Sequence, residues 1–192
     1  MKNLVIFASG AGTNAQNIMK YFQNDTGVKV RLVISNNPRA GVLKIAEQAG
    51  IPTLVIDKHT LYETTEVLDL LTALPADLIV LAGFLWKVPD ALVSAFSGRI
   101  INIHPALLPK YGGKGMYGMR VHEAVISSGD QQSGITIHFV NEKYDEGEMI
   151  LQKPCPVTPE DTPGSLAQKV HQLEYRWYPE TIAKLLFTKK KV

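Results

Sequence analysis

Short apolar runs alternate with stretches of helical periodicity through the first half of the chain. The apolar runs cover residues 3–9, 28–34, 53–56 and 77–84, and each has the length of a buried strand. Apolar residues then return every three or four positions, which predicts helices after the glycine-rich turn at 10–14 and over residues 38–50, 61–74 and 90–96. This order predicts consecutive βα units on a parallel sheet.

The second half of the chain has a different order. The run Ile100–His104 predicts a buried strand, residues 121–128 a helix, and residues 133–140 and 149–156 two strands joined by an acidic turn. Residues 162–184 have the spacing of a long closing helix that Pro179 interrupts or restarts. We therefore expect an α/β fold, doubly wound and Rossmann-like, with a mainly parallel sheet and an antiparallel part in the C-terminal half.

Composition limits the class of protein. The 192 residues contain no linker or repeat, so we expect a single domain over 1–192. The 20 Lys and Arg nearly balance the 18 Asp and Glu, which argues against nucleic acid as a partner, and the one basic run, Lys189–Lys191, is expected to be a solvated terminus. No apolar run approaches about 18 residues and no secretory signal is present, which predicts a cytoplasmic protein without a membrane partner. Cys155 is the only cysteine, so the sequence offers neither a disulfide nor a cysteine cluster for zinc.

A glycine-rich turn, Gly10–Asn14, separates the first strand from the first helix. Glycines let a ligand approach the backbone, and the free amides of a helix start attract an anion, to which Thr13 and Asn14 add side-chain donors. The same residues fit a loose dinucleotide-binding pattern, or serve only the turn. A dinucleotide site calls for an acidic residue after the second strand, where this chain has Ser35-Asn36-Asn37-Pro38, so a monophosphate is the favoured ligand.

Two later loops have patterns with two interpretations each. Residues 83–89 are unusually apolar for the carboxyl edge of a sheet, and Phe84 and Trp86 either hold a flat heterocycle or pack into the core. Residues 110–118 combine four glycines with two lysines, which is typical of a mobile lid with an anion role or of a flexible connection. Neither pattern decides between its two interpretations.

Two polar residues, Asn102 and His104, share one face of the buried strand at 100–104. An amide can donate to a carbonyl oxygen that becomes negative, and an imidazole exchanges a proton near neutral pH, so together they suit acyl transfer. If Asp145 reached them from the acidic turn it would orient the imidazole, and His138 could approach the same edge. The other interpretation of His104 is a hydrogen-bonded core residue. The remaining histidines lack partners in the sequence, and no spacing of His, Asp and Glu resembles a metal site.

Residues 102–109, Asn-Ile-His-Pro-Ala-Leu-Leu-Pro, resemble the signature of the folate-dependent formyltransferases. Three more motifs occur in the order and spacing of the phosphoribosylglycinamide formyltransferases within that family, namely Gly10–Asn14 after the first strand, Leu81–Phe84, and Asp145-x-Gly147. The resemblance covers essentially the whole chain. The phosphate loop, together with the lack of an appended C-terminal domain, favours this group over the methionyl-tRNA formyltransferases.

The resemblance implies transfer of the formyl group of 10-formyltetrahydrofolate, a donor co-substrate, to the amine of glycinamide ribonucleotide in purine biosynthesis, with no metal. It implies a nucleotide- and phosphate-binding half over 1–100, a catalytic and folate-binding half over 101–192, and a monomer or homodimer. Asn102 and His104 would stabilise the tetrahedral oxyanion, and Asp145 would hold His104 and help move the proton. The implied contacts are Gly12, Thr13, Asn14 and Glu174 for the nucleotide, and Leu85, Trp86, Val88, Asn102, Val140 and Asn141 for the folate.

The chain departs from the family pattern at two places. Trp86 stands where familiar bacterial members carry arginine, so a charge contact to the folate tail is replaced by stacking or lost. Residues 111–120 are longer than usual and lack the histidine before the position of His122. Three other functions stay open at this point. They are formyl transfer to another amine, such as an amino sugar nucleotide, a nicotinamide-dependent oxidoreductase that uses the glycine turn, and a non-catalytic nucleotide-binding module.

Overall fold

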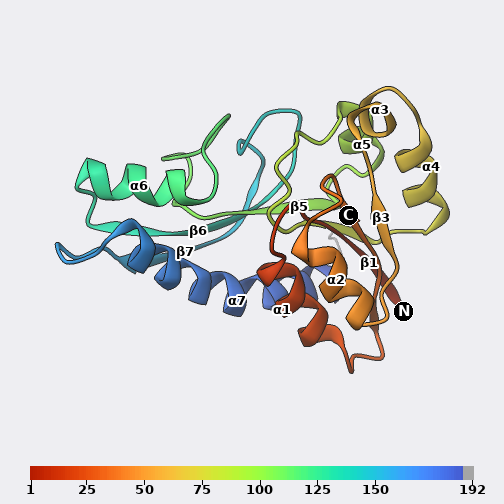
Figure 1. The fold of residues 1–192 in the computed structure, drawn as a ribbon, viewed down its shortest axis with the longest axis horizontal. Coiled ribbons are helices and arrows are strands. Elements are labelled where there is room, and N and C mark those ends of the chain that lie inside the picture. The colour runs from red at the N-terminus through yellow and green to blue at the C-terminus, as the bar shows by residue number, and fades with distance from the viewer. Residues whose placement is uncertain (188–192) are drawn as a thin grey trace.

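The computed structural model describes residues 1–187, and the strands in that part of the chain form one sheet in the order β3-β2-β1-β4-β5-β6-β7 (Figure 1). Neighbours from β3 to β5 pair in parallel, whereas β6 pairs antiparallel with both β5 and β7. This confirms the predicted fold class. The basic run Lys189–Lys191 lies outside the described residues. The strands are β1 (Lys2–Phe7), β2 (Val28–Ser35), β3 (Thr53–Val55), β4 (Leu78–Leu81), β5 (Ile100–His104), β6 (Gln132–Phe139) and β7 (Met149–Pro156).

Helices cover both faces of the sheet, because its central strands are apolar on both sides. In β1, Leu4 and Ile6 face one core and Val5 and Phe7 face the other. The first core is closed by α1, α2, α6 and α7, and the second by α3, α4 and α5, which Figure 1 shows grouped at one end of the molecule. The helices are α1 (Thr13–Phe22), α2 (Gly41–Gln48), α3 (Lys58–Tyr62), α4 (Glu66–Ala73), α5 (Asp90–Ala95), α6 (Met119–Ser128) and α7 (Pro163–Phe187).

The turn from β1 into α1 is built as the sequence predicts. Helix α1 buries Ala15, Ile18, Met19 and Phe22, which share one helical face. Gly12 precedes the helix with a φ of 82°, and a Cβ atom built on it would lie 2.6 Å from the Cβ of Val42. Only glycine fits there, because both the left-handed backbone and the close approach of α2 exclude a side chain. The amino end of α1 is thereby pressed against α2 at the carboxyl edge of the sheet.

Two predicted elements in the first half have wrong boundaries. The helix expected over 61–74 is two helices, α3 and α4, because the chain breaks at residues 63–65, where the Thr64 hydroxyl donates to the carbonyl of Thr60 at 2.9 Å. Helix α3 also starts at Lys58, before the predicted start at residue 61, because Asp57 caps the helix by accepting from the backbone N–H of Thr60. Strand β4 ends at Leu81 rather than at residue 84, since Gly83 turns the chain with a φ of 76°.

Pro179 neither interrupts nor restarts the closing helix, contrary to expectation. Helix α7 runs through it from Pro163 to Phe187. A proline in a helix leaves the carbonyl four residues earlier without its N–H partner. Here that carbonyl belongs to Tyr175, and the side-chain amide of Asn17 in α1 donates to it at 2.6 Å. A contact between two helices far apart in the sequence therefore replaces the missing hydrogen bond.

Candidate active site

The register of β5 against β6 brings two polar side chains together. Asn102 lies directly opposite His138. Its Nδ2 atom is 3.3 Å from Nε2 of His138, while Nδ1 of His138 is 2.9 Å from the carbonyl of Phe139. That carbonyl can only accept, so His138 carries a proton on Nδ1, and in the neutral ring Nε2 accepts from the Asn102 amide. His138 thus orients the amide of Asn102, and the second N–H of that amide is left to donate to another acceptor. The sequence hypothesis that His138 approaches this edge is confirmed.

His104 is buried at the end of β5, with 3% of its surface exposed. Its Nε2 atom lies 2.7 Å from the carbonyl of Tyr111, and its Nδ1 atom lies 3.6 Å from Oδ2 of Asp145. Burial lowers the pKa of His104, and this outweighs the opposite effects of Asp145 and of the Tyr111 carbonyl. The ring is therefore neutral at neutral pH, with its proton on Nε2 and its lone pair on Nδ1. The contact with Asp145 becomes a full ion pair only when His104 takes up a proton.

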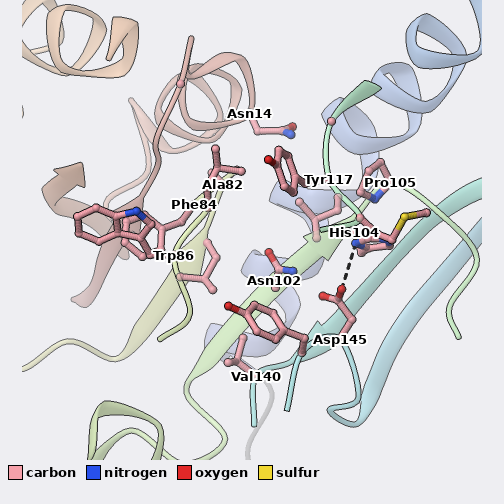
Figure 2. Close-up of a pocket in the computed structure, with 18 of the residues that line it drawn as sticks. Asn14, Ala82, Phe84, Trp86, Asn102, His104, Pro105, Tyr117, Val140 and Asp145 are labelled. Carbon is pink, nitrogen blue, oxygen red and sulfur yellow. Dashed lines mark ion pairs between the residues drawn. The ribbon is translucent and has the colours of Figure 1, made fainter. Parts of the chain in front are cut away.

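Asp145 reaches the two histidines from the loop between β6 and β7. Its Oδ1 lies 3.5 Å from Nε2 of His138, and its Oδ2 accepts from the backbone N–H of Gly113 at 2.9 Å. Burial raises its pKa, but hydrogen bonding to His138 and the charge of His104, both of which act when the imidazoles are protonated, together with the N–H of Gly113 outweigh burial and hold the pKa below the ordinary value. Gly147 lets this loop fold back, because a Cβ atom there would lie 1.7 Å from the carbonyl of Phe139. Figure 2 shows the carboxylate directed at His104.

These residues open into a cavity of about 750 Å³ at the carboxyl edges of β1, β4 and β5. In Figure 2, Phe84 and Trp86 lie on the opposite side of the cavity from His104 and Asp145, and Asn102 lies between them. Asn14 reaches the same space from the amino end of α1. Every site residue expected from the sequence lines this one cavity, namely Gly12, Thr13, Asn14, Leu85, Trp86, Val88, Asn102, His104, Val140, Asn141, Asp145 and Glu174.

A buried carboxylate, Glu174 of α7, marks the end of the cavity near α1. One of its oxygens, Oε2, accepts from Nδ2 of Asn14 at 2.9 Å and lies 2.8 Å from Nδ1 of His171. This contact with Glu174 raises the pKa of His171 and so favours its charged form. His122 also lines the cavity, and its buried Nδ1, like Oδ1 of Asn14, has no hydrogen-bond partner among the described residues. Such polar atoms favour a ligand with hydroxyl groups.

Sequence reasoning missed His122 and His171. The spacing of His171 and Glu174, three apart on one helix, was a signal that could have found the second of them. His122 carries no such signal, because its neighbours in the cavity come from other elements.

The apolar loop after β4 fits both sequence interpretations at once. The ring of Phe84 meets the buried ring of Phe7 edge-on at 5.2 Å, so it packs on the core while lining the cavity. Trp86 follows with its ring centroid 6.4 Å from that of Phe84 and 6.3 Å from that of Tyr62, and Leu85 is 54% exposed. The loop presents an apolar ledge with aromatic rings inclined to one another, and a heterocycle can stack on a ring of this kind.

The glycine-rich loop lies over the same cavity, to which it contributes Lys114 and Tyr117. Gly113, Gly115 and Gly118 all have positive φ angles, which glycine adopts without a steric penalty. Whether the loop moves as a lid stays a prediction. Within residues 1–187, no group of three or more His, Cys, Asp and Glu side chains is arranged to hold a metal ion. In the same part of the chain, none of the helices has the length and apolar character needed to cross a bilayer.

Comparison with known proteins shows extensive similarity. A model of the formyl transferase family matches residues 2–182. The chain is 41% identical to a chloroplastic phosphoribosylglycinamide formyltransferase of Arabidopsis thaliana, covering 94% of this chain but 64% of that protein, less than two thirds of its length. It is 38% identical to a phosphoribosylglycinamide formyltransferase of Haemophilus influenzae, with coverage of 95% and 86%. A crystal structure of the Bacillus halodurans phosphoribosylglycinamide formyltransferase superposes with a TM-score of 0.86 at 36% identity, covering 97% and 96% of the two chains.

Proposed function

This chain belongs to the formyl transferase family, and from that membership we propose that it transfers the formyl group of 10-formyltetrahydrofolate to the amine of glycinamide ribonucleotide, as a step of purine biosynthesis. One observation carries the proposal. An anion-binding helix start, a polar end with Glu174 and an aromatic ledge meet in one cavity at Asn102, His104 and Asp145. A nucleotide and a heterocyclic donor would each have an arm of the cavity, with their reacting atoms beside the polar cluster.

The acceptor nucleotide binds in the arm between α1 and α7. Its phosphate lies on the first backbone amides of α1, at Gly12, Thr13 and Asn14, because these amides lack partners within the helix and carry the positive end of its dipole. Its ribose hydroxyls donate to Glu174, whose carboxylate Asn14 and His171 hold in place. Strand β2 ends in Ser35 without a following carboxylate, which argues against the ribose of a nicotinamide dinucleotide.

The folate donor binds in the arm formed by the ledge and the end of β6. Leu85, Trp86 and Val88 offer apolar contact, and Val140 and Asn141 close the arm from the other side. The donor supplies the formyl carbonyl that the amine attacks. Trp86 offers a stacking contact to the folate in place of the charged contact to its tail that an arginine would make.

The chemistry follows from the protonation states of the cluster. The amine nitrogen attacks the formyl carbon, and the oxyanion that forms accepts a hydrogen bond from the free N–H of Asn102. Nδ1 of His104 takes the proton that the amine releases, Asp145 stabilises the resulting imidazolium, and the charged imidazolium joins Asn102 in stabilising the oxyanion. The bond from the formyl carbon to the folate nitrogen then breaks, and that nitrogen receives the proton, directly or through water. The products are a formylated amine and tetrahydrofolate, so atoms and charge balance.

A panel of amine acceptors tests this proposal. The enzyme is incubated with 10-formyltetrahydrofolate and, separately, with glycinamide ribonucleotide, an amino sugar nucleotide and methionyl-tRNA, and kcat/KM is measured for each. We expect glycinamide ribonucleotide to exceed the others by at least about a hundredfold, because its phosphate and ribose fit the arm between α1 and α7 while its amine lies at the polar cluster. A higher kcat/KM with another amine would refute the proposed acceptor and identify that amine as the substrate. A cytoplasmic location and a monomer or homodimer stay predictions.

A further inference from the structure

Tyr111 has a backbone conformation that bulky residues rarely adopt. Its φ is 57°, in the left-handed region. In this conformation its carbonyl lies 2.7 Å from Nε2 of His104, and two residues later the N–H of Gly113 donates to Asp145 at 2.9 Å. One short turn therefore contacts both members of the His104–Asp145 pair from behind. Unusual backbone geometry beside a reactive pair must be held by contacts elsewhere.

The side chain of Tyr111 supplies those contacts. Its hydroxyl donates to Oδ2 of Asp130 at 2.9 Å and also contacts the hydroxyl of Ser128 at the end of α6. Lys110 lies 2.9 Å from the same carboxylate oxygen of Asp130, and together the ammonium and the tyrosine hydroxyl hold the pKa of Asp130 below its ordinary value. Lys110, Tyr111 and Asp130 line a separate cavity of about 440 Å³. They touch neither proposed substrate arm.

We propose that Tyr111, anchored by Asp130, is a positioning residue that holds its carbonyl against Nε2 of His104 and so keeps Nδ1 unprotonated, beside Asp145 and open to the proton of the reacting amine. Without the anchor, the left-handed turn relaxes and the carbonyl leaves His104. The ring then populates the opposite tautomer, in which Nδ1 carries the proton and cannot accept one. The effect on catalysis rests on the proposed function, whereas the effect on the His104 tautomer does not.

The carbonyl also influences the protonation of His104, because it accepts from Nε2 more strongly when the ring is charged. Losing it lowers the pKa of His104 further below the ordinary value. The titratable groups that face His104 are Asp145 from the β6–β7 loop, His138 from β6, His122 from α6 and Glu174 from α7. Removal of the anchor changes none of these groups, so a shift in the pKa of His104 reports a change in the turn at Tyr111.

Two substitutions remove the anchor from opposite ends. Tyr111→Phe deletes the hydroxyl and keeps the ring, and Asp130→Ala deletes its acceptor. We expect each to lower kcat about tenfold, to leave both KM values within about twofold, and to move the acidic limb of the kcat/KM profile to lower pH. Should Tyr111→Phe fail to fold, Asp130→Ala still tests the proposal.

Two control variants separate positioning from stability. Tyr21→Phe removes a hydroxyl from a half-exposed tyrosine on α1. Asp161→Ala breaks a lysine–aspartate pair of the same kind, with Lys169, away from both cavities. We expect the first to behave as wild type and the second to lose thermal stability without moving the pH profile. A drop in kcat for Asp161→Ala equal to that for Asp130→Ala would overturn the proposal, since stability alone would then account for it.

Nitrogen-15 NMR of the His104 ring gives a readout that needs no turnover. In the wild-type enzyme we expect one tautomer with its proton on Nε2, and in Tyr111→Phe and Asp130→Ala a mixture of the two tautomers. An unchanged tautomer together with an unchanged kcat in both variants would refute the positioning role. If the wild-type enzyme formylates no acceptor, the proposed function fails, and the NMR result still decides whether Tyr111 positions His104.

Discussion

Replacing Asp145 by asparagine tests how the cluster works, because the change keeps the shape of the side chain and removes its charge. The carboxylate lies 3.6 Å from Nδ1 of His104, and both side chains are largely buried, with 13% and 4% exposed. At an effective dielectric constant of about 20, a full charge pair at this distance is stabilised by about 4 to 5 kcal/mol. The amide dipole restores part of this, which leaves about 3 kcal/mol, or about a hundredfold in kcat.

The effect should fall on kcat, because the charge pair forms only when His104 takes up the proton of the amine. Asp145→Asn should leave both KM values within about threefold, since the backbone contact with Gly113 survives. The charge of Asp145 raises the pKa of His104 against the larger effect of burial. Its removal therefore lowers that pKa, and the acidic limb of kcat/KM moves to lower pH.

Steady-state kinetics with both substrates, measured across the pH range, provides the assay. The matched control is Glu146→Gln in the same loop, which removes an exposed charge paired with Lys143 and should leave kcat unchanged. A value of kcat for Asp145→Asn within about threefold of wild type, or a limb that moves to higher pH, would refute the reasoning.

Three further substitutions test separate parts of the account. Asn102→Ala removes the oxyanion donor and should lower kcat by about 10²- to 10³-fold with little change in either KM, and a loss below about tenfold in steady-state kinetics would contradict its role. Trp86→Ala removes the aromatic ring of Trp86 from the ledge and should raise KM for the folate about tenfold while KM for the nucleotide stays constant. An equal rise in both KM values would argue against a folate-specific contact. Gly12→Ala places a Cβ atom 2.6 Å from Val42 at a φ of 82° and should lower Tm by about 4 to 8 °C, the equivalent of about 2 kcal/mol. An unchanged Tm by calorimetry would contradict it.

The parts of the fold that follow from local sequence were predictable. The first strand, the turn and α1 could be predicted, because the apolar spacing and Gly12 that determine them lie within about 20 residues of one another. The split between α3 and α4 was hidden, because Leu61 to Leu74 keeps helical spacing across a break that the Thr64 side chain stabilises. The continuity of α7 through Pro179 could not be predicted, since the compensating donor, Asn17, lies about 160 residues earlier.

The candidate site shows the same division. Asn102 and His104 were found from the strand alone, because polar side chains on a buried strand need a reason to be there. Asp145 was a candidate in the acidic turn, but its place beside His104 followed only from the family resemblance, since an acidic turn gives no sign of which residue it approaches. The spacing of His171 and Glu174 on α7 could have revealed that pair. His122 and the Tyr111 carbonyl reach the site through the packing of α6 and of one turn beside β5, and spacing along the chain does not encode such contacts.

The central claim is direct transfer of the formyl group to glycinamide ribonucleotide, and labelling the formyl carbon of 10-formyltetrahydrofolate tests it in one experiment. The enzyme is mixed with labelled donor, glycinamide ribonucleotide and a pool of unlabelled formate, and the products are separated and counted. The account predicts that the label appears in the formylated nucleotide in step with the tetrahydrofolate released, undiluted by the formate pool. Label that appears as free formate, or a nucleotide that stays unformylated, would contradict it.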